Sequence, residues 1–424
     1  MEKFQHRVFK IEYNDFVIVY IPTLYRLYRI TKEAAEKVPS HIKADIKLPV
    51  SRWDNLPDYT FFGTNLILTN KCNLACAYCY GEYSPKKDKV MTEEVAYAAV
   101  DYIIKSVLET GWRKLVYLNF FGGEPTQSWD LIVDISEYLR KNAAKYNLRS
   151  RLTITTNGCM PLENAQWLAR NVDGINISID GFKSIQDAQR SQSFDRVFPI
   201  AQEIYRLFPS KLRFRSTVSA SSVEYLPQIV DFFGKNFSGC PQMYEPLFTM
   251  GRGVKNGICA MPDADIFFRK YIDSISIAKR YGSKLKTSVL KLTTKSKDLF
   301  CGVAARNFMI TPDSRATVCN RMVEEDINEA ANLFTYGKYD HEKKSFIFDN
   351  ERYQWLKRLT VLQIPECIDC FAGSICKGDC PANKAALSPK DFWIKKSFRC
   401  EAIKRFAKNI LLYVLENGYN GLLA

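Results

Sequence analysis

The sequence predicts an α/β protein built around a partial (β/α)6 barrel, with a small β-rich module before the barrel and a loop-rich region after it. Between about residues 64 and 285, short apolar runs alternate with amphipathic stretches. Before this part, short apolar runs separated by turn residues indicate an antiparallel meander, and after about residue 290 Gly, Pro and Cys interrupt the alternation. We therefore expect three units: residues 1–60, 61–290 and 291–424.

The central unit carries the clearest periodicity. Buried strands are expected at Asn65–Thr69, Leu115–Phe120, Leu152–Thr156, Gly174–Ile179, Leu212–Val218 and Gln242–Pro246, with helices between them at segments such as Thr92–Glu109, Ser128–Tyr146 and Leu226–Asn236. Thr92 is a suitable N-cap, and two glutamates follow it in the first turn. Repeated strand–helix units imply a parallel sheet, and functional groups then lie where the strands end.

The flanking units are less regular. The first is expected to contain strands at Arg7–Glu12, Phe16–Ile21 and Tyr25–Ile30, with a helix at Thr31–Val38. The last is expected to end in an apolar helix near Glu401–Glu416. Because this last unit has little predicted core of its own, we expect bound metal to stabilise it.

Composition excludes several classes of protein. The net charge is +14, but the basic residues are scattered, so we interpret them as a solvated surface and expect no nucleic-acid partner. His6, His41 and His341 are the only histidines, which argues against sites built from several imidazoles. No apolar stretch approaches the roughly 20 residues of a membrane span, and the N-terminus is unlike a signal peptide, so the cytoplasm is the expected location and no membrane partner is expected.

The 13 cysteines fall into groups. Cytosolic thiols are rarely used for disulfides, so grouped cysteines indicate metal or redox work. The groups are Cys72, Cys76 and Cys79; Cys301 and Cys319; and Cys367, Cys370, Cys376, Cys380 and Cys400. Cys159, Cys240 and Cys259 stand alone and are interpreted as small buried apolar residues.

The first group follows the first barrel strand directly. Three thiols within eight residues can converge on one centre. Three cysteines form an incomplete zinc site, although a zinc-binding trio remains an alternative. A four-iron cluster held by three thiolates leaves one iron open.

The spacing C-x3-C-x2-C, with Tyr78 before the last cysteine, resembles the signature of the radical SAM superfamily. The resemblance implies that Cys72, Cys76 and Cys79 hold a 4Fe–4S cluster, and that S-adenosylmethionine binds the open iron through its amine and carboxylate and is cleaved reductively. It places Tyr78 against the adenine. It also implies cofactor contacts at successive strand ends. These are Gly122, Gly123 and Glu124 for the methionine amine, Asn157 after the third strand, and Ser178 and Asp180 at the ribose of the nucleoside. Arg190, in an Asp187-x2-Arg190 element, is implied for the methionine carboxylate. Taken singly, each of these elements is also an ordinary turn or strand end.

The later cysteines resemble the SPASM extension, an auxiliary iron–sulfur domain of radical SAM enzymes that modify peptides. The resemblance assigns Cys367, Cys370, Cys376 and Cys400 to an outer 4Fe–4S cluster and Cys301, Cys319 and Cys380 to an inner one. A zinc site remains an alternative for the Cys367–Cys380 run. Ser314 replaces a glycine of the family pattern, and no cysteine lies within residues 302–318. The inner cluster would then lack one cysteine ligand. The iron without a ligand is open to a cysteine of the substrate, or Cys259 binds it, or the inner cluster is assembled incompletely.

Together these resemblances imply a radical SAM peptide maturase, similar to thioether-forming sactipeptide and ranthipeptide synthases. Its expected substrate is a ribosomally synthesised precursor peptide, whose leader binds residues 1–60 unless that module merely closes the barrel, and its expected electron donor is an external flavodoxin or ferredoxin. Glu245 is a candidate for lining the substrate cavity. Carbon–carbon or ether cross-linking, epimerisation, peptide-derived cofactor synthesis, RNA modification and a non-enzymatic iron–sulfur scaffold remain open. A sulfatase-maturase-like activity is also an alternative, disfavoured because Asn320 stands where such relatives carry aspartate.

Overall fold

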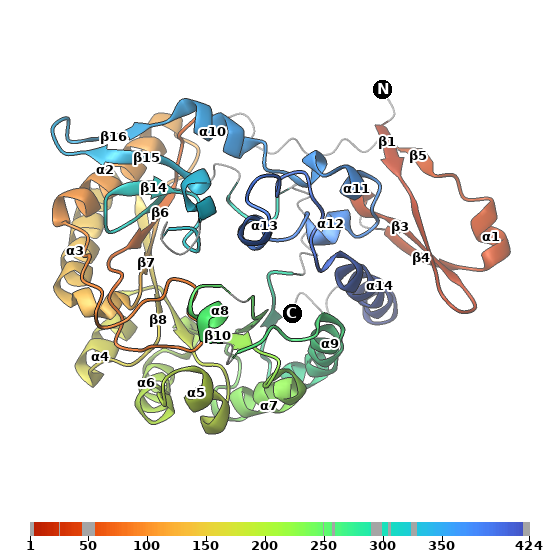
Figure 1. Ribbon diagram of the computed structural model, residues 1–424, viewed down its shortest axis with the longest axis horizontal. Helices are drawn as coiled ribbons and strands as arrows, with labels where there is room; N and C mark the ends of the chain where they lie inside the picture. The colour runs from red at the N-terminus through yellow and green to blue at the C-terminus, as the bar shows by residue number, and fades with distance from the viewer. Residues whose placement is uncertain are drawn as a thin grey trace.

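The computed structural model describes residues 4–24, 26–44, 56–248, 250–256, 259–289, 299–303, 307–323 and 329–418. Its centre is a curved parallel sheet with helices on the outside (Figure 1). Within the described residues, no helix is both long enough and apolar enough to span a membrane.

The expected run of six parallel strands is confirmed. In chain order the strands are β6 (Gly63–Ile67), β7 (Leu115–Phe121), β8 (Arg149–Thr156), β9 (Gly174–Ser178), β10 (Leu212–Val218) and β11 (Gln242–Pro246), and β12 (Leu285–Lys286) adds a short seventh. The helices between them are α2 (Glu93–Thr110), α3 (Trp129–Lys145), α4 (Leu162–Asn171), α5 (Lys183–Gln189), α6 (Phe194–Leu207), α7 (Leu226–Asn236), α8 (Arg252–Asn256) and α9 (Ala264–Arg280). As expected, the Thr92 side chain caps α2 by accepting a hydrogen bond from the backbone N–H of Val95.

Strand alternation determines which side chains face the interior of the barrel. In β10, Leu212, Phe214 and Val218 are buried beneath the helices. Arg215, between Phe214 and Ser216, is exposed on the opposite face. Arg215 is paired in register with Ser178 on β9, so these two side chains lie on the same face of the sheet at neighbouring positions.

The C-terminal unit continues the barrel sheet, which the sequence did not predict. β13 (Met309–Ile310) pairs in parallel with β6, and β14 (Arg315–Thr317), β15 (Thr335–Asp340) and β16 (Ser345–Phe348) extend the sheet to eleven strands. The expectation of little core here does not hold, because Phe334, Tyr336 and Phe392 are fully buried and Phe334 stacks on Phe392 with ring centroids 5.6 Å apart. The helices that follow are α10 (Asn350–Lys357), α11 (Pro365–Ile368), α12 (Gly373–Cys376), α13 (Pro381–Leu387) and α14 (Cys400–Asn417).

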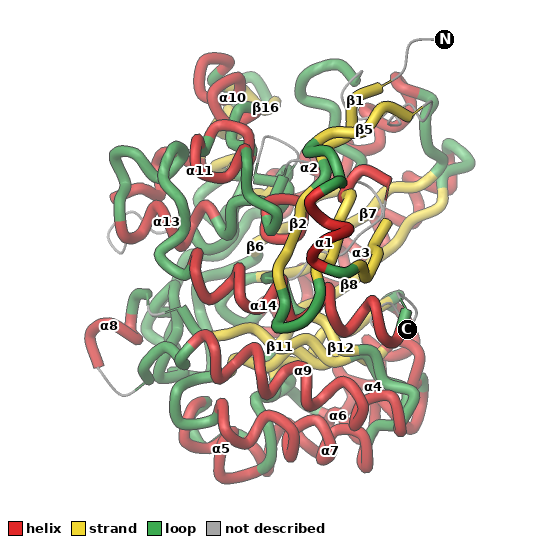
Figure 2. Tube along the Cα trace, turned by 90° about the vertical axis from the view of Figure 1, so that its right-hand side faces the viewer, coloured by secondary structure: helices red, strands yellow, loops and turns green. Residues whose placement is uncertain are grey.

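The N-terminal module contains the expected antiparallel meander. Its strands are β2 (Phe9–Glu12), β3 (Val17–Ile21) and β4 (Arg26–Ile30), followed by α1 (Lys32–Glu36), while β1 (Phe4–Arg7) pairs with β5 (His41–Ala44). The meander packs on the C-terminal helices, since Ile11, Ile18 and Tyr20 share a small core with Ile375 and Leu411. Figures 1 and 2 both place α14 beside this sheet.

The turn between β13 and β14 allows a stability prediction. Ser314, where the SPASM resemblance leads us to expect glycine, has φ of 66°, and its backbone N–H donates to the carbonyl of Thr311 at 3.0 Å. This left-handed conformation is unfavourable for a side chain with a Cβ. We expect Ser314→Gly to raise the free energy of unfolding by about 0.5–1 kcal/mol and the Tm by about 1–2 °C, measured by thermal denaturation. Ser314→Ala keeps the Cβ, so an equal gain in that variant would contradict the explanation.

Candidate functional site

The loop after β6 brings the first three cysteines together. Cys72 is 7% exposed, and the electrostatic fields of Cys76 and Cys79 both act on its thiol. Burial, reinforced by the carboxylate of Glu124, raises the pKa of Cys72 to about 12, and burial raises the pKa of Cys76 to about 11. Buried thiols of this kind become thiolates only beside a compensating cation, so this donor set fits an iron–sulfur cluster.

A cluster and a single ion require different spacings of their ligands. Across the described ranges of the chain, no three His, Cys, Asp or Glu side chains are grouped closely enough to share one metal ion. A four-iron cluster binds each cysteine through a different iron, so its thiolates lie farther apart than those on one ion.

Glu124 is a structural carboxylate in this arrangement. It is completely buried; Oε1 accepts hydrogen bonds from the Thr126 backbone and from the Thr126 and Thr156 hydroxyls, and Oε2 accepts one from the backbone N–H of Asn157 at 2.7 Å. Burial nevertheless raises the pKa of Glu124. Its contacts therefore join the end of β7 to the end of β8. The role in binding the methionine amine remains a prediction for the Gly122–Glu124 segment.

The two residues before Glu124 must be glycines, because other parts of the backbone lie too close for a side chain. A Cβ on Gly122 would lie 2.7 Å from the carbonyl oxygen of Thr69, and one on Gly123 would lie 2.4 Å from that of Lys71. The two glycines therefore allow this turn to approach the chain that leads into Cys72. The sequence analysis assigned Gly122 and Gly123 to a contact with the cofactor and did not predict this close approach between two backbone segments.

Asn157 reaches the cysteine loop directly. Its Nδ2 donates to Oδ1 of Asn73 at 2.8 Å and lies 3.7 Å from Sγ of Cys72. Its Oδ1 accepts from the backbone N–H of Cys159 at 2.8 Å. The side chain thus holds the first cysteine against the end of β8.

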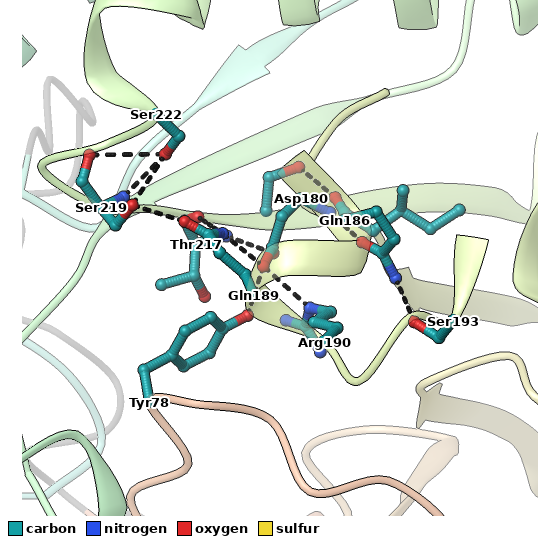
Figure 3. Close-up of polar contacts among 11 residues, drawn as sticks. Tyr78, Asp180, Gln186, Gln189, Arg190, Ser193, Thr217, Ser219 and Ser222 are labelled. Carbon is teal, nitrogen blue, oxygen red and sulfur yellow. Dashed lines mark hydrogen bonds and ion pairs between the residues drawn. The ribbon is translucent and has the colours of Figure 1, made fainter. Parts of the chain in front are cut away.

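Asp180 is the centre of a buried polar network (Figure 3). Its side chain is fully buried; Oδ2 accepts from the Tyr78 hydroxyl at 2.6 Å and lies 3.0 Å from Nε of Arg190. Gln189 donates to the same carboxylate at 2.7 Å, and the backbone N–H of Thr217 donates to Oδ1 at 2.9 Å. The structure therefore brings together three residues that the sequence singled out, Tyr78, Asp180 and Arg190.

Two neutral amides of this network were missed by the sequence analysis. Gln186 donates to Ser193 at 2.9 Å and accepts from the backbone N–H of Asp180 at 2.8 Å, and Gln189 accepts from the Ser219 hydroxyl (Figure 3). Both amides lie on α5, close to Arg190 in the sequence. The contacts of Tyr78 with the adenine and of Ser178 with the nucleoside remain predictions.

The later cysteines form two groups. The electrostatic fields of Cys370 and Cys400 act on Cys367, and that of Cys367 acts on Cys376, so the four residues predicted for the outer cluster lie together. Burial, followed by the neighbouring Cys370 and Cys400, raises the pKa of Cys367 to about 11.

The second group pairs Cys319 with Cys380. Burial, followed by Cys380, raises the pKa of Cys319 to about 11. Cys301 is exposed in the short segment 299–303, and its place in the inner ligand set remains a prediction. Cys259 is buried, and burial followed by the nearby carboxylate of Asp180 raises the pKa of its thiol. Cys259 therefore lies near the first site.

A buried ion pair joins the two auxiliary groups. Nη2 of Arg399 lies 2.7 Å from Oδ1 of Asp379, Nε donates to Oδ2 at 3.2 Å, and the Ser397 hydroxyl donates to Oδ2 at 2.6 Å. Asp379 precedes Cys380, and Arg399 precedes Cys400. The pair therefore holds in place the two chain segments that carry these cysteines.

Residues 66–218 match the Radical SAM superfamily. The chain contains a radical SAM domain. This family implies S-adenosylmethionine and a 4Fe–4S cluster as cofactors of the domain.

Three curated relatives are similar to parts of this chain. An uncharacterised protein of Archaeoglobus fulgidus is 24% identical over 354 residues, covering 80% of this chain and 78% of that protein. The radical SAM cyclopropyl synthase TigE of Paramaledivibacter caminithermalis is 29% identical over 250 residues, covering 51% of this chain and 52% of TigE. A probable GTP 3',8-cyclase of Methanococcus maripaludis is 30% identical over 177 residues, covering 40% of this chain and 54% of that protein. The chain thus spans about half the length of the latter two.

Solved structures show the same fold over most of the chain. The structure of anSMEcpe with bound AdoMet and a peptide has a TM-score of 0.65 at 19% identity, covering 84% of this chain and 99% of its own. Streptococcus suis SuiB bound to the precursor peptide SuiA has a TM-score of 0.56 at 13% identity, covering 91% and 96%. At these identities the comparison establishes the fold alone.

The cysteine loop is also held by a clamp that the sequence did not reveal. The backbone N–H of Arg252 donates to the carbonyl of Cys79 at 3.1 Å, Nη1 donates to that of Cys76 at 2.8 Å, and Nη2 donates to that of Tyr83 at 2.7 Å. Gly251 precedes it with φ of 54°, and a Cβ there would lie 2.5 Å from the carbonyl oxygen of Tyr80. The loop after β11 therefore holds the cysteine loop from the opposite side of the barrel.

We expect Arg252→Ala to lower cluster occupancy. Each hydrogen bond from the guanidinium stabilises the observed conformation of the cysteine loop by about 1.5–3 kcal/mol. Without these bonds the cysteine ligands are held less firmly in position. Iron per chain and the EPR signal of the reduced first cluster measure the effect. Arg206→Ala is a matched control, because that exposed guanidinium contacts only Glu203 on its own helix among the described residues. Full iron content and an unaltered signal in Arg252→Ala would show that the clamp is dispensable.

Proposed function

We propose that this protein is a radical SAM peptide maturase that abstracts hydrogen from a ribosomally synthesised precursor peptide and forms an intramolecular cross-link, with a cysteine thioether as the first product to test. The observation that carries the proposal is the pair of additional cysteine groups attached to the barrel, Cys319 with Cys380 and Cys367 with Cys370, Cys376 and Cys400. The resemblance of these groups to the SPASM extension supports a peptide substrate, as do the two peptide-bound neighbours.

The chain's own residues have separable tasks in this proposal. Cys72, Cys76 and Cys79 hold the first cluster, which together with S-adenosylmethionine supplies a radical able to abstract hydrogen from an unactivated carbon. Asp180 holds the Tyr78 ring and the Arg190 guanidinium in fixed positions, so that both can orient the cofactor. The auxiliary cysteines hold two further 4Fe–4S clusters, which can accept an electron when a bond closes, and a flavodoxin or ferredoxin supplies the reducing electrons.

A second product class is supported by a relative. The similarity to TigE, whose name describes it as a cyclopropyl synthase, favours carbon–carbon bond formation as the alternative within peptide chemistry. The similarity to a probable GTP 3',8-cyclase covers 40% of this chain. A nucleotide substrate is therefore the alternative outside peptide chemistry, and the auxiliary cysteine groups weigh against it only through their resemblance to the SPASM extension.

Anaerobic reconstitution followed by turnover tests the proposal. Three 4Fe–4S clusters require about twelve irons per chain. A short cysteine-containing peptide encoded beside the gene is expected to lose the mass of two hydrogen atoms per cross-link, measured by mass spectrometry with fragmentation to locate the bond. Formation of 5′-deoxyadenosine with GTP, but with no modified peptide, would instead favour the nucleotide alternative.

The N-terminal module is proposed to bind the leader of the precursor peptide. β4 is an edge strand of its sheet, and exposed Arg26, Tyr28 and Arg29 project from it, so a leader can add as a further strand. We expect deletion of residues 1–50 to weaken leader binding at least about tenfold, measured by fluorescence anisotropy. Peptide-independent formation of 5′-deoxyadenosine serves as the control for an intact barrel. Undiminished affinity for the leader would exclude the assignment.

A further inference from the structure

Tyr80 lies between the first cysteine site and the auxiliary cysteines. It follows Cys79 directly, Cζ of Arg321 lies 5.8 Å from the centre of its ring, and Arg215 and Cys319 are close enough to influence its phenol electrostatically. The hydroxyl oxygen is buried and has no hydrogen-bond partner within the described part of the chain. A buried phenol without a partner is uncommon, since buried tyrosine hydroxyls are normally hydrogen-bonded.

Arg215 brings a guanidinium to the same place from the barrel. It lies on the interior face of β10, next to Ser178 on β9. Within the described residues its side chain makes no hydrogen bond and no ion pair, unlike those of Arg190 and Arg399, each of which is paired with a buried aspartate. Its positive charge is therefore not matched by a carboxylate of the protein in this region.

Arg321 brings a second guanidinium from the C-terminal unit. Nη1 donates to the side-chain oxygen of Asn383 on α13 at 2.6 Å, and Nη2 lies 3.3 Å from Sδ of Met250. Its Cζ lies 5.8 Å from the centre of the Tyr80 ring. These partners are neutral, so they orient the guanidinium without cancelling its charge.

We propose that Tyr80, Arg215 and Arg321 form a carboxylate-binding site that anchors an acidic residue or the C-terminus of the peptide near the reacting residue. The inference rests on the proposed peptide substrate and names its chemical class. A carboxylate offers about four lone-pair positions, and planar guanidinium groups match its geometry, so one carboxylate can accept from a phenol and two arginines together. A nucleoside triphosphate would carry more negative charge than two guanidinium groups neutralise.

Saturation-transfer NMR on the reconstituted holoenzyme with S-adenosylmethionine tests the site. The probes are N-acetyl-aspartate N-methylamide for an acidic side chain, N-acetylglycine for a chain terminus, N-acetyl-asparagine N-methylamide as the neutral control, and GTP. We expect a carboxylate probe to bind with a Kd of about 1–10 mM and the asparagine probe at least about tenfold more weakly. Whichever carboxylate probe binds more tightly identifies the source of the carboxylate.

The variants Arg215→Gln and Tyr80→Phe are each expected to weaken the carboxylate probe about tenfold, with iron content measured to verify an intact first cluster. Arg280→Gln, an exposed arginine on α9, is the matched control and is expected to leave the affinity unchanged. Equal binding of the aspartate and asparagine probes, unchanged affinity in both variants, or no carboxylate binding at about 20 mM would overturn the inference. Tighter binding of GTP at this site would overturn it in favour of a nucleotide substrate.

The two proposals fail separately. Carboxylate binding is measured without turnover, so it can persist when no peptide is modified, and the proposed function alone then fails. If a peptide is modified but neither Arg215→Gln nor Tyr80→Phe changes the affinity for the carboxylate probe, only the carboxylate-binding site is refuted.

Discussion

A Cys76→Ala variant is expected to lose about four of about twelve irons and essentially all cleavage of S-adenosylmethionine. Cys76 is one of three ligands with no fourth cysteine beside them, so two thiolates would remain to hold the first cluster. Because enzymatic acceleration is typically at least about 10⁶-fold, formation of 5′-deoxyadenosine should fall at least about 10³-fold. Iron analysis and chromatography of 5′-deoxyadenosine measure the two effects.

Cys240→Ala is the matched control for this variant. Cys240 is also buried, but it lies in the hydrophobic core, and the one hydrogen bond of its Sγ among the described residues is to the carbonyl oxygen of Pro209, at 3.7 Å. We expect its removal to leave iron content and cleavage unchanged. Retained cleavage in Cys76→Ala, or zinc in place of iron in the anaerobically purified protein, would refute the assignment of the first site.

An Asp379→Asn variant is expected to lower the free energy of unfolding by about 3 kcal/mol, because it leaves the buried charge of Arg399 without its partner. Asparagine has the same shape as aspartate and tolerates the φ of 62° at this position, so the substitution tests the charge alone. The auxiliary iron should fall as well, since the pair joins the segments of Cys380 and Cys400. Chemical denaturation and iron analysis provide the two readouts.

The exposed pair of Arg405 and Asp265 supplies the comparison for Asp379→Asn. It has the same chemistry and also involves α14, but both side chains are about half exposed, at 59% and 49%. Solvent screens such a pair, so Asp265→Asn should barely move the denaturation midpoint. Similar losses in the two variants would show that burial of the Asp379 pair is not the source of its effect.

The sequence alone predicted the features that depend on residue spacing along the chain. β10 and β11 were predicted with their observed bounds. The cysteine groups follow from spacing along the chain, and the structure gathers Cys72 with Cys76 and Cys79. Thr92 caps its helix as its position predicted.

The remaining features depend on tertiary contacts. β13 has two residues and β14 has three, which is too short to show a period. The ion pair of Arg190 with Asp180 depends on how the end of α5 lies beside the segment that follows β9, and the amides of Gln186 and Gln189 form no motif that distinguishes them from surface glutamines. Arg252 and Arg321 act across segments far apart in the sequence, so spacing along the chain could not identify them.

The parallel pairing of β13 with β6 bears on how a substrate gains access. Met309 is in register with Asn65, and Ile310 with Leu66, so backbone hydrogen bonds run without interruption from the barrel into the cysteine-rich unit. Relative rotation of these two units would have to break that ladder, which leaves little freedom for a hinge. The proposed peptide substrate would therefore have to enter a rigid frame, and the separation between the first cysteine site and the auxiliary thiols would be fixed before the peptide binds.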